Sequence, residues 1–215
     1  MEKITVQESR GWYQDADPVH DFDHVLRVYR LAERIAHAEG ADLEVVRTAA
    51  LLHDSRGSAP GEEGEARAEH HIASAEFAGE VLTEKGWPDE KIAAVQHCIR
   101  AHRFRGKEDA PESLEAKVLF DADKLDVLGA IGAARTVAYA ALDKQPIFSE
   151  PSQKFMKTGE KEIGEPHSSY HEFLFKLRKV KDRMFTRTGK ILADARHAYL
   201  VEFYTQLQAE VRGER

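Results

Sequence analysis

The sequence has few cysteines, no long apolar run and no excess of basic residues, and each of these absences argues against a class of protein. Its single cysteine, Cys98, excludes an internal disulfide, so we expect a reducing compartment, the cytoplasm. No stretch approaches the roughly 18 uninterrupted apolar residues of a membrane helix, and the polar N-terminus carries no apolar signal region. Basic residues are outnumbered 31 to 38, and the net charge of −7 argues against a nucleic-acid polymer as partner. We therefore expect a soluble protein that binds neither membranes nor nucleic acid.

Long runs of alternating apolar and polar residues, typical of strands, are also missing. Apolar residues recur at helical spacing almost everywhere, so the sequence predicts an all-α protein. A chain of 215 residues can bury one sizeable core, and we expect a single domain, 1–215. Helices are predicted over about 21–39, 42–54, 66–85, 89–102, 112–142, 168–186 and 190–212.

Glycine and proline interrupt this helical pattern at a few places. Gly129 and Gly132 each cost about 1 kcal/mol inside a helix, so they indicate a kink or close packing within 112–142. The long polar connection 143–168 is typical of a lid, a binding loop or a disordered segment. The sequence Arg-Thr-Gly at 187–189 is expected to separate the last two helices.

Histidine is abundant, with eleven in the chain, and two His-Asp pairs stand out in VHDFDH (19–24) and AALLHD (49–54). In the second pair His53 follows Val46 and Ala50 at helical spacing, so it points where the core face points. The side chains of His53 and Asp54 lie about 100° apart, and they can share a cation only just off the helix end. Further ligands must then come from other helices.

Donors for such a cation occur in four other stretches of the sequence. His24 lies in DFDHVLRV, Asp123 in DADKLD, and His71 and His102 in HHIASA and CIRAHRF. Imidazole and carboxylate together suit Mn²⁺, Fe²⁺, Co²⁺, Ni²⁺, Zn²⁺ or Mg²⁺. The sequence therefore indicates a divalent metal ion.

This order of residues, H…HD…D on successive helices, resembles the HD superfamily of metal-dependent phosphohydrolases. The stretches HDFDHVLRV, AALLHD, HHIASAEFA, HCIRAHRFRG, LEAKVLFDADKLDVLGAIGAART and SSYHEFLFKL with DRMFTRTGK are similar to the small stand-alone members, over about residues 18–200. The resemblance implies an HD-like helical bundle, with its core at about 18–142 and two additional C-terminal helices at about 168–212. It implies metal ligands at His24, His53, Asp54 and Asp123.

Some HD proteins hold a second ion with extra histidines at positions that match His71 and His102. The resemblance thus implies one or two ions, with Asp54 as the bridge between two. Alternatively, both histidines contact phosphate. His71 also suits a polar position beside small residues, and His102 suits a helix end, where the dipole stabilises its charge.

Other polar residues near these ligands have supporting roles or none. Asp126 lies near the face of Asp123 and is placed to orient an imidazole, and His97 is read as a similar support or as plain surface. Asp121 is read as a solvated acid. A glutamate that assists the water in some HD enzymes is replaced here by Gly57, so the general base stays unassigned.

The remaining histidines and Cys98 carry weaker hypotheses. His20 suits a surface role or the edge of the pocket, with Asp21 as a helix N-cap. His167 and His171 are spaced like metal ligands, but HSSYHE is not the HExxH of zinc peptidases, so a helix start or a substrate contact is expected. Cys98 is expected to fill the core.

Phosphate chemistry also needs positive charge. Arg56 and Arg103 directly follow predicted ligands and can clamp phosphoryl oxygens. Further candidates are Arg105, Lys107, Lys124, Lys176, Arg183 and Lys190. With a metal-activated water, the expected reaction is hydrolysis at phosphorus of a phosphorylated small molecule, a nucleotide by resemblance. An HD-type di-iron oxygenase and a non-catalytic nucleotide sensor remain alternatives, and the sequence leaves a homo-oligomer open.

Overall fold

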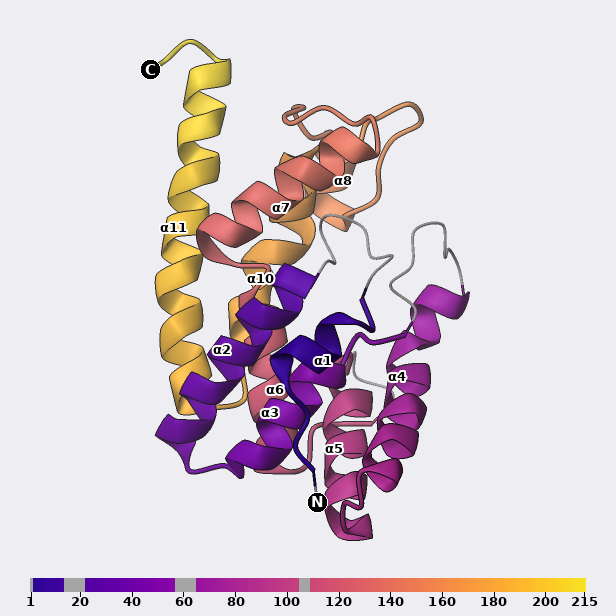
Figure 1. Ribbon diagram of the computed structural model, residues 1–215. Coiled ribbons are helices and arrows are strands. Elements are labelled where there is room, and N and C mark those ends of the chain that lie inside the picture. Colours follow the sequence, from indigo (N-terminus) through magenta and orange to yellow (C-terminus); the bar gives the residue numbers. More distant parts are fainter. Residues whose placement is uncertain (1, 14–21, 57–64, 105–108) are drawn as a thin grey trace. The chain divides into compact units, whose positions relative to one another are not determined.

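The computed structural model describes residues 2–13, 22–56, 65–104 and 109–215, with the backbone alone for 65–69. Within these ranges every regular element is a helix, which confirms the all-α prediction (Figure 1). The predictions for His20 and Asp21 fall outside the described residues.

The helices match the predicted ranges closely. They are α1 (Val6–Arg10), α2 (Phe22–Glu39), α3 (Leu43–Leu52), α4 (Glu65–Glu84), α5 (Asp89–Ala101), α6 (Leu114–Leu125), α7 (Gly129–Leu142), α8 (Gln153–Thr158), α9 (Ser169–Glu172), the π-helix η1 (Phe173–Leu177), α10 (Arg178–Val180), the 3-10 helix η2 (Lys181–Arg183) and α11 (Arg187–Val211). The short α1 is an addition. Its signal is a capping box, in which Thr5 accepts from the Glu8 backbone and the Glu8 side chain accepts from Thr5.

Contacts divide the chain into two compact units. Unit 1 comprises Met1–Asp123 and Met184–Gly189, and unit 2 comprises Lys124–Arg183 and Lys190–Arg215. Among the described residues no single helix is long and apolar enough to cross a membrane.

Helix α3 is the central element of unit 1, because it packs against α1, α2, α4 and α5. Asp42 caps its start and accepts from the backbone N–H groups of Glu44, at 2.8 Å, and Val45, at 3.3 Å. Cys98 on α5 is fully buried in the same unit, and burial raises the pKa of its thiol. Its expected place in the core is confirmed.

Asp121 on α6 is fully buried, so its reading as a solvated acid is wrong. Its carboxylate accepts from the backbone N–H of Phe185 at 2.9 Å, and from the backbone N–H and hydroxyl of Thr186 at 2.8 and 2.7 Å. Thr186 in turn accepts from the N–H of Gly189 at 2.9 Å, as a helix N-cap does. The last helix therefore begins at Arg187, and the expected break at 187–189 lies three residues earlier, at 184–186.

We expect Asp121→Ala to lower the free energy of unfolding by about 3 kcal/mol or more, because three donors to a buried charge lose their acceptor. Urea denaturation of the purified protein measures this loss. The exposed Asp109→Ala serves as the matched control and should change stability by less than about 0.5 kcal/mol. A loss below about 1 kcal/mol for Asp121→Ala would contradict the anchoring role.

In unit 2 both glycines of the predicted helix 112–142 act as expected. Gly129 begins α7 with a φ of 71°, a conformation that favours glycine, so the predicted segment consists of two abutting helices. A Cβ atom on Gly132 would lie 2.2 Å from the carbonyl oxygen of Val127, which is the close packing that the sequence indicated.

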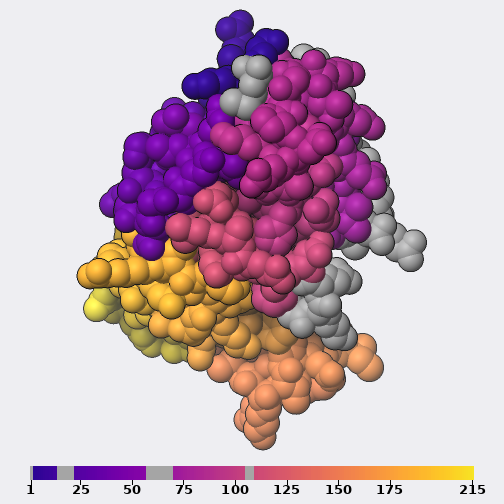
Figure 2. All heavy atoms as spheres, turned by 90° about the horizontal axis from the view of Figure 1, so that it is seen from below, coloured from indigo at the N-terminus to yellow at the C-terminus, as the bar shows by residue number. Residues whose placement is uncertain are grey.

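The connection 143–168 is ordered around one carboxylate and contains α8. Glu165 accepts from the backbone N–H and hydroxyl of Ser152, both at 2.7 Å, and lies 3.0 Å from His171 Nε2. His171 stands in the first turn of α9, which confirms its place at a helix start. The stretch around 150–165 projects from the surface of unit 2 (Figure 2), and Ile163 is fully exposed.

Candidate metal centre

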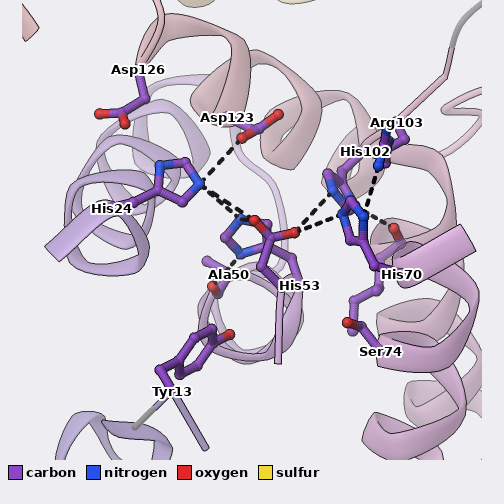
Figure 3. Close-up of polar contacts among 12 residues, drawn as sticks. Tyr13, His24, Ala50, His53, His70, Ser74, His102, Arg103, Asp123 and Asp126 are labelled. Carbon is purple, nitrogen blue, oxygen red and sulfur yellow. Dashed lines mark hydrogen bonds and ion pairs between the residues drawn. The ribbon is translucent and has the colours of Figure 1, made fainter. Parts of the chain in front are cut away.

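Six histidine and aspartate side chains from five helices meet in unit 1 (Figure 3). They are His24 in the first turn of α2, His53 and Asp54 directly after α3, His70 on α4, His102 directly after α5, and Asp123 on α6. Four of them are the residues that the sequence singled out as one ligand set. Residues up to 99 positions apart in the chain are thus brought to one place.

The first group of possible ligands is His24, His53 and Asp123. His24 Nε2 lies 3.3 Å from His53 Nε2 and 3.5 Å from Asp123 Oδ1. Asp54 faces this group with Oδ2, which lies 3.6 Å from His24 Nε2 and 3.5 Å from His53 Nε2. His24 Nε2 thus lies within 3.6 Å of three other donor atoms, on His53, Asp54 and Asp123, at distances that leave room for an ion among them.

The second group is Asp54, His70 and His102. Asp54 uses its other oxygen here, since Oδ1 lies 3.1 Å from His70 Nε2 and 3.3 Å from His102 Nε2. The two oxygens of Asp54 thus face different sets of imidazoles. This carboxylate has the position of a bridge between the groups.

Two of the imidazoles have their orientation and tautomer fixed by their own helices. His53 Nδ1–H donates to the Ala50 carbonyl at 2.8 Å, and His102 Nδ1–H donates to the Ile99 carbonyl at 2.6 Å. A carbonyl oxygen only accepts, so Nδ1 carries the proton and Nε2 presents its lone pair. Each bond also satisfies a carbonyl in the last turn of a helix, which explains why the histidine follows the helix end.

The residues fit a divalent cation. In the first group the lone pair on His53 Nε2 faces Asp54 Oδ2 at 3.5 Å, an approach of acceptor to acceptor that a positive charge between them stabilises. Asp54 Oδ1 is buried, and the Nε2 atoms of His70 and His102 lie 3.1 and 3.3 Å from it. Asp54 and Asp123 supply two negative charges, which balance one divalent ion.

The HD domain family matches residues 21–128, about half of the chain, and this stretch holds all six side chains. The chain belongs to the HD domain family. Protein YpgQ of Bacillus subtilis (strain 168) is 32% identical over 215 residues, which cover 96% of this chain and 94% of that protein.

Solved structures of bacterial proteins are similar to this chain over nearly its whole length. The crystal structure of B. subtilis YpgQ in complex with ADP has a TM-score of 0.73 at 30% identity, and the alignment covers 97% of this chain and 99% of that one. An HD-superfamily hydrolase from Bacillus thuringiensis has a TM-score of 0.72 at 28% identity, with 96% and 94% covered. The fold predicted by resemblance is therefore confirmed.

In this HD domain His70 replaces the expected His71 in the second group. His71 is buried, and its ring centroid lies 6.5 Å from that of His102, but it belongs to neither group. It shares the buried face of α4 with Ser74 and Ala75, as the alternative reading proposed. The sequence missed His70 because adjacent histidines differ by only about 100° around a helix.

The side chains of the two arginines that were expected to bind phosphate contact aromatic rings of α4, His70 and Phe77. Arg103 donates to His70 Nδ1 at 2.7 Å. The Arg56 guanidinium lies 3.5 Å from the ring centroid of Phe77, a cation–π contact, while its backbone N–H donates to Ser74. Phosphate binding by either arginine stays a prediction.

The two residues that were expected to support the ligands, Asp126 and His97, make hydrogen bonds of their own, and their supporting role stays a prediction. His97 Nε2 accepts from the Glu112 backbone N–H at 3.2 Å, and His97 belongs to neither ligand group. Asp126 is buried in unit 2 and accepts from Arg135. Gly57, Arg105 and Lys107 fall outside the described residues.

Protonation within the centre is strongly shifted. Burial would raise the pKa of the Asp54 carboxyl, but the surrounding histidines, His53 and His102 foremost, hold this pKa well below its usual range. Burial lowers the pKa of His102 to about 4, against the opposing pull of Asp54. Near neutral pH the centre therefore contains a carboxylate and a neutral imidazole, the forms that bind metals.

We expect the metal-free protein to lose stability as the pH falls from about 6.5 to about 4. Over this range unfolded His102 takes up a proton whereas folded His102 does not, so acid favours unfolding by up to about 1.4 kcal/mol per pH unit. Urea denaturation of the wild type and of His102→Gln checks this, with the exposed His37→Gln as control. The same pH dependence in wild type and His102→Gln would contradict the assignment.

Proposed function

We propose that this HD domain is a metal-dependent phosphohydrolase that cleaves an ester or anhydride bond of a nucleotide. The observation that carries the proposal is the imidazole lone pair of His53, directed at the Asp54 carboxylate beside His24 and Asp123. The nucleotide is supported by B. subtilis YpgQ, whose structure has been solved in complex with ADP.

His24, His53, Asp54 and Asp123 would hold the ion. Two imidazoles with two carboxylates suit Mn²⁺, Co²⁺, Ni²⁺ or Fe²⁺ better than Mg²⁺, which prefers oxygen ligands and keeps several waters. When bound, such an ion makes a water nucleophilic near neutral pH and polarises a phosphoryl oxygen.

The chain's own residues orient the ligand side chains and place positive charge near the phosphoryl oxygens. The bond from His53 to Ala50 keeps the ring from turning, so its Nε2 stays directed at the centre. Arg103, 2.7 Å from His70, places a guanidinium beside the centre, where its N–H groups can bind phosphoryl oxygens. In the reaction the oxygen of the water bonds to phosphorus, and the bond between phosphorus and the leaving oxygen breaks. The leaving oxygen takes up one proton, which balances the proton that the attacking water loses. Cys98 takes no part, because it is buried and its pKa is raised.

A substrate screen tests this function. The metal-stripped protein is incubated with AMP, ADP, ATP, deoxynucleotides and a phosphodiester, each with Mn²⁺, Co²⁺, Ni²⁺, Fe²⁺ or Mg²⁺. Phosphate is measured with and without added inorganic pyrophosphatase, which separates release of phosphate from release of pyrophosphate. We expect hydrolysis of at least one nucleotide, with Mn²⁺ or Co²⁺ above Mg²⁺.

Two other results would overturn the proposal. Nucleotide binding without turnover under any metal would favour the sensor. Consumption of O₂ by the iron-loaded protein, without phosphate release, would favour the di-iron oxygenase, for which the shared position of Asp54 between two ligand groups is the supporting observation.

A further inference from the structure

The imidazole of His70 carries its proton on the opposite nitrogen from the imidazoles of His53 and His102. Its Nδ1 lies 2.7 Å from Nη1 of Arg103 (Figure 3). A guanidinium has N–H donors only and keeps its proton at every accessible pH. Nδ1 of His70 therefore accepts, and in the neutral ring the proton sits on Nε2, the atom that lies 3.1 Å from Asp54 Oδ1.

This proton position conflicts with metal binding at His70. A neutral imidazole has one nitrogen lone pair, and here Arg103 uses it. For Nε2 to bind a cation, the proton must move to Nδ1, where its N–H would face an N–H of Arg103 at 2.7 Å. Two donors repel at that distance, so Arg103 must leave before His70 can become a ligand.

The balance of charges in the centre also disfavours a second cation. The two ligand groups together contain two carboxylates, Asp54 and Asp123, enough to neutralise one divalent ion. A second ion would add two positive charges beside the guanidinium of Arg103, with no further carboxylate in either group. The residues of the second group thus do not fit a cation while Arg103 holds His70, whereas those of the first group do.

We infer that Arg103 is a gate on the second cation position: its bond to His70 and a metal ion at His70, His102 and Asp54 exclude each other. The resting centre then holds one ion, and the His70 Nε2–H with the Arg103 guanidinium supplies positive charge next to it. This inference rests on the proposed function only in taking the first group as a divalent-cation site.

Metal stoichiometry tests the gate directly. Wild type, Arg103→Met, Arg100→Met and the double variant Arg103→Met/His70→Gln are stripped and equilibrated by dialysis at one fixed free Mn²⁺ concentration. Bound manganese is measured by mass spectrometry, and spin coupling between neighbouring ions is measured by electron paramagnetic resonance. Methionine keeps the length of the arginine stem without its donors, and Arg100, three residues earlier on α5, is the matched control.

We expect one Mn²⁺ per chain in the wild type and Arg100→Met, and two coupled ions in Arg103→Met. The double variant should return to one ion, because its second position lacks His70. Two ions in the wild type, or one ion in a folded Arg103→Met, would overturn the gate. Long-range ¹⁵N correlation spectra of the metal-free wild type give a second readout, with the His70 proton on Nε2 expected and a proton on Nδ1 contradictory. A shift in stoichiometry without nucleotide hydrolysis would support the gate and reject the proposed function.

Discussion

Asp54→Asn is expected to lower nucleotide hydrolysis about 1,000-fold or more. Asp54 faces both ligand groups, with Oδ2 at 3.5 Å from His53 Nε2 and Oδ1 at 3.3 Å from His102 Nε2. The amide removes one of the two negative charges of the centre, and an ion there contributes several kcal/mol to transition-state stabilisation, where about 4 kcal/mol corresponds to about 1,000-fold.

Steady-state phosphate release, with metal content determined on the same samples, measures this effect. The exposed Asp109→Asn is the matched control and should keep wild-type activity and metal content. Circular dichroism and a thermal melt verify that Asp54→Asn folds. Activity within about tenfold of the wild type, in a folded Asp54→Asn that has lost its metal, would show that the ion is not needed for hydrolysis.

Removal of the metal is expected to abolish hydrolysis and to lower the melting temperature by about 8 to 16 °C. Four ligands of this centre come from α2, the end of α3 and α6, so an ion there links helices that are distant in the sequence. An ion present at about 1,000 times its dissociation constant stabilises the folded state by about 4 kcal/mol. For a chain of this size, 1 kcal/mol corresponds to about 2 to 4 °C.

Thermal unfolding by calorimetry, before and after chelation and again after addition of Mn²⁺, measures the shift. The His24→Gln variant, which lacks a ligand of the first group, should show a much smaller shift between its metal-free and metal-treated forms. A melting temperature that does not respond to the ion in the wild type would argue against binding at this centre.

Local periodicity predicts the direction of one ligand side chain in this centre. His53 follows Val46 and Ala50 on one face of α3, and all three are buried, so the direction of the imidazole was readable from the spacing. The meeting of Asp123 with His24 and His53 depends on tertiary packing, and it was predicted from the resemblance to HD proteins rather than from spacing.

Other features depend on neighbours that no local pattern reveals. Whether His70 or His71 faces Asp54 depends on how α4 is rotated about its axis, and the sequence prediction differed from the structure by one residue in this respect. The burial of Asp121 follows from its three donors in Phe185 and Thr186, more than sixty positions away. The contact of Arg103 with His70, 33 positions apart, likewise follows from the packing of α5 against α4.

The most direct test of the account is a crystal structure of the protein grown with Mn²⁺, with data collected at a wavelength where manganese scatters anomalously. We predict an anomalous peak at about 2.0 to 2.3 Å from His24 Nε2, His53 Nε2, Asp54 Oδ2 and Asp123 Oδ1, a usual range for divalent ions with such ligands. A well-ordered structure with no peak among these four atoms, or with manganese bound elsewhere, would contradict it.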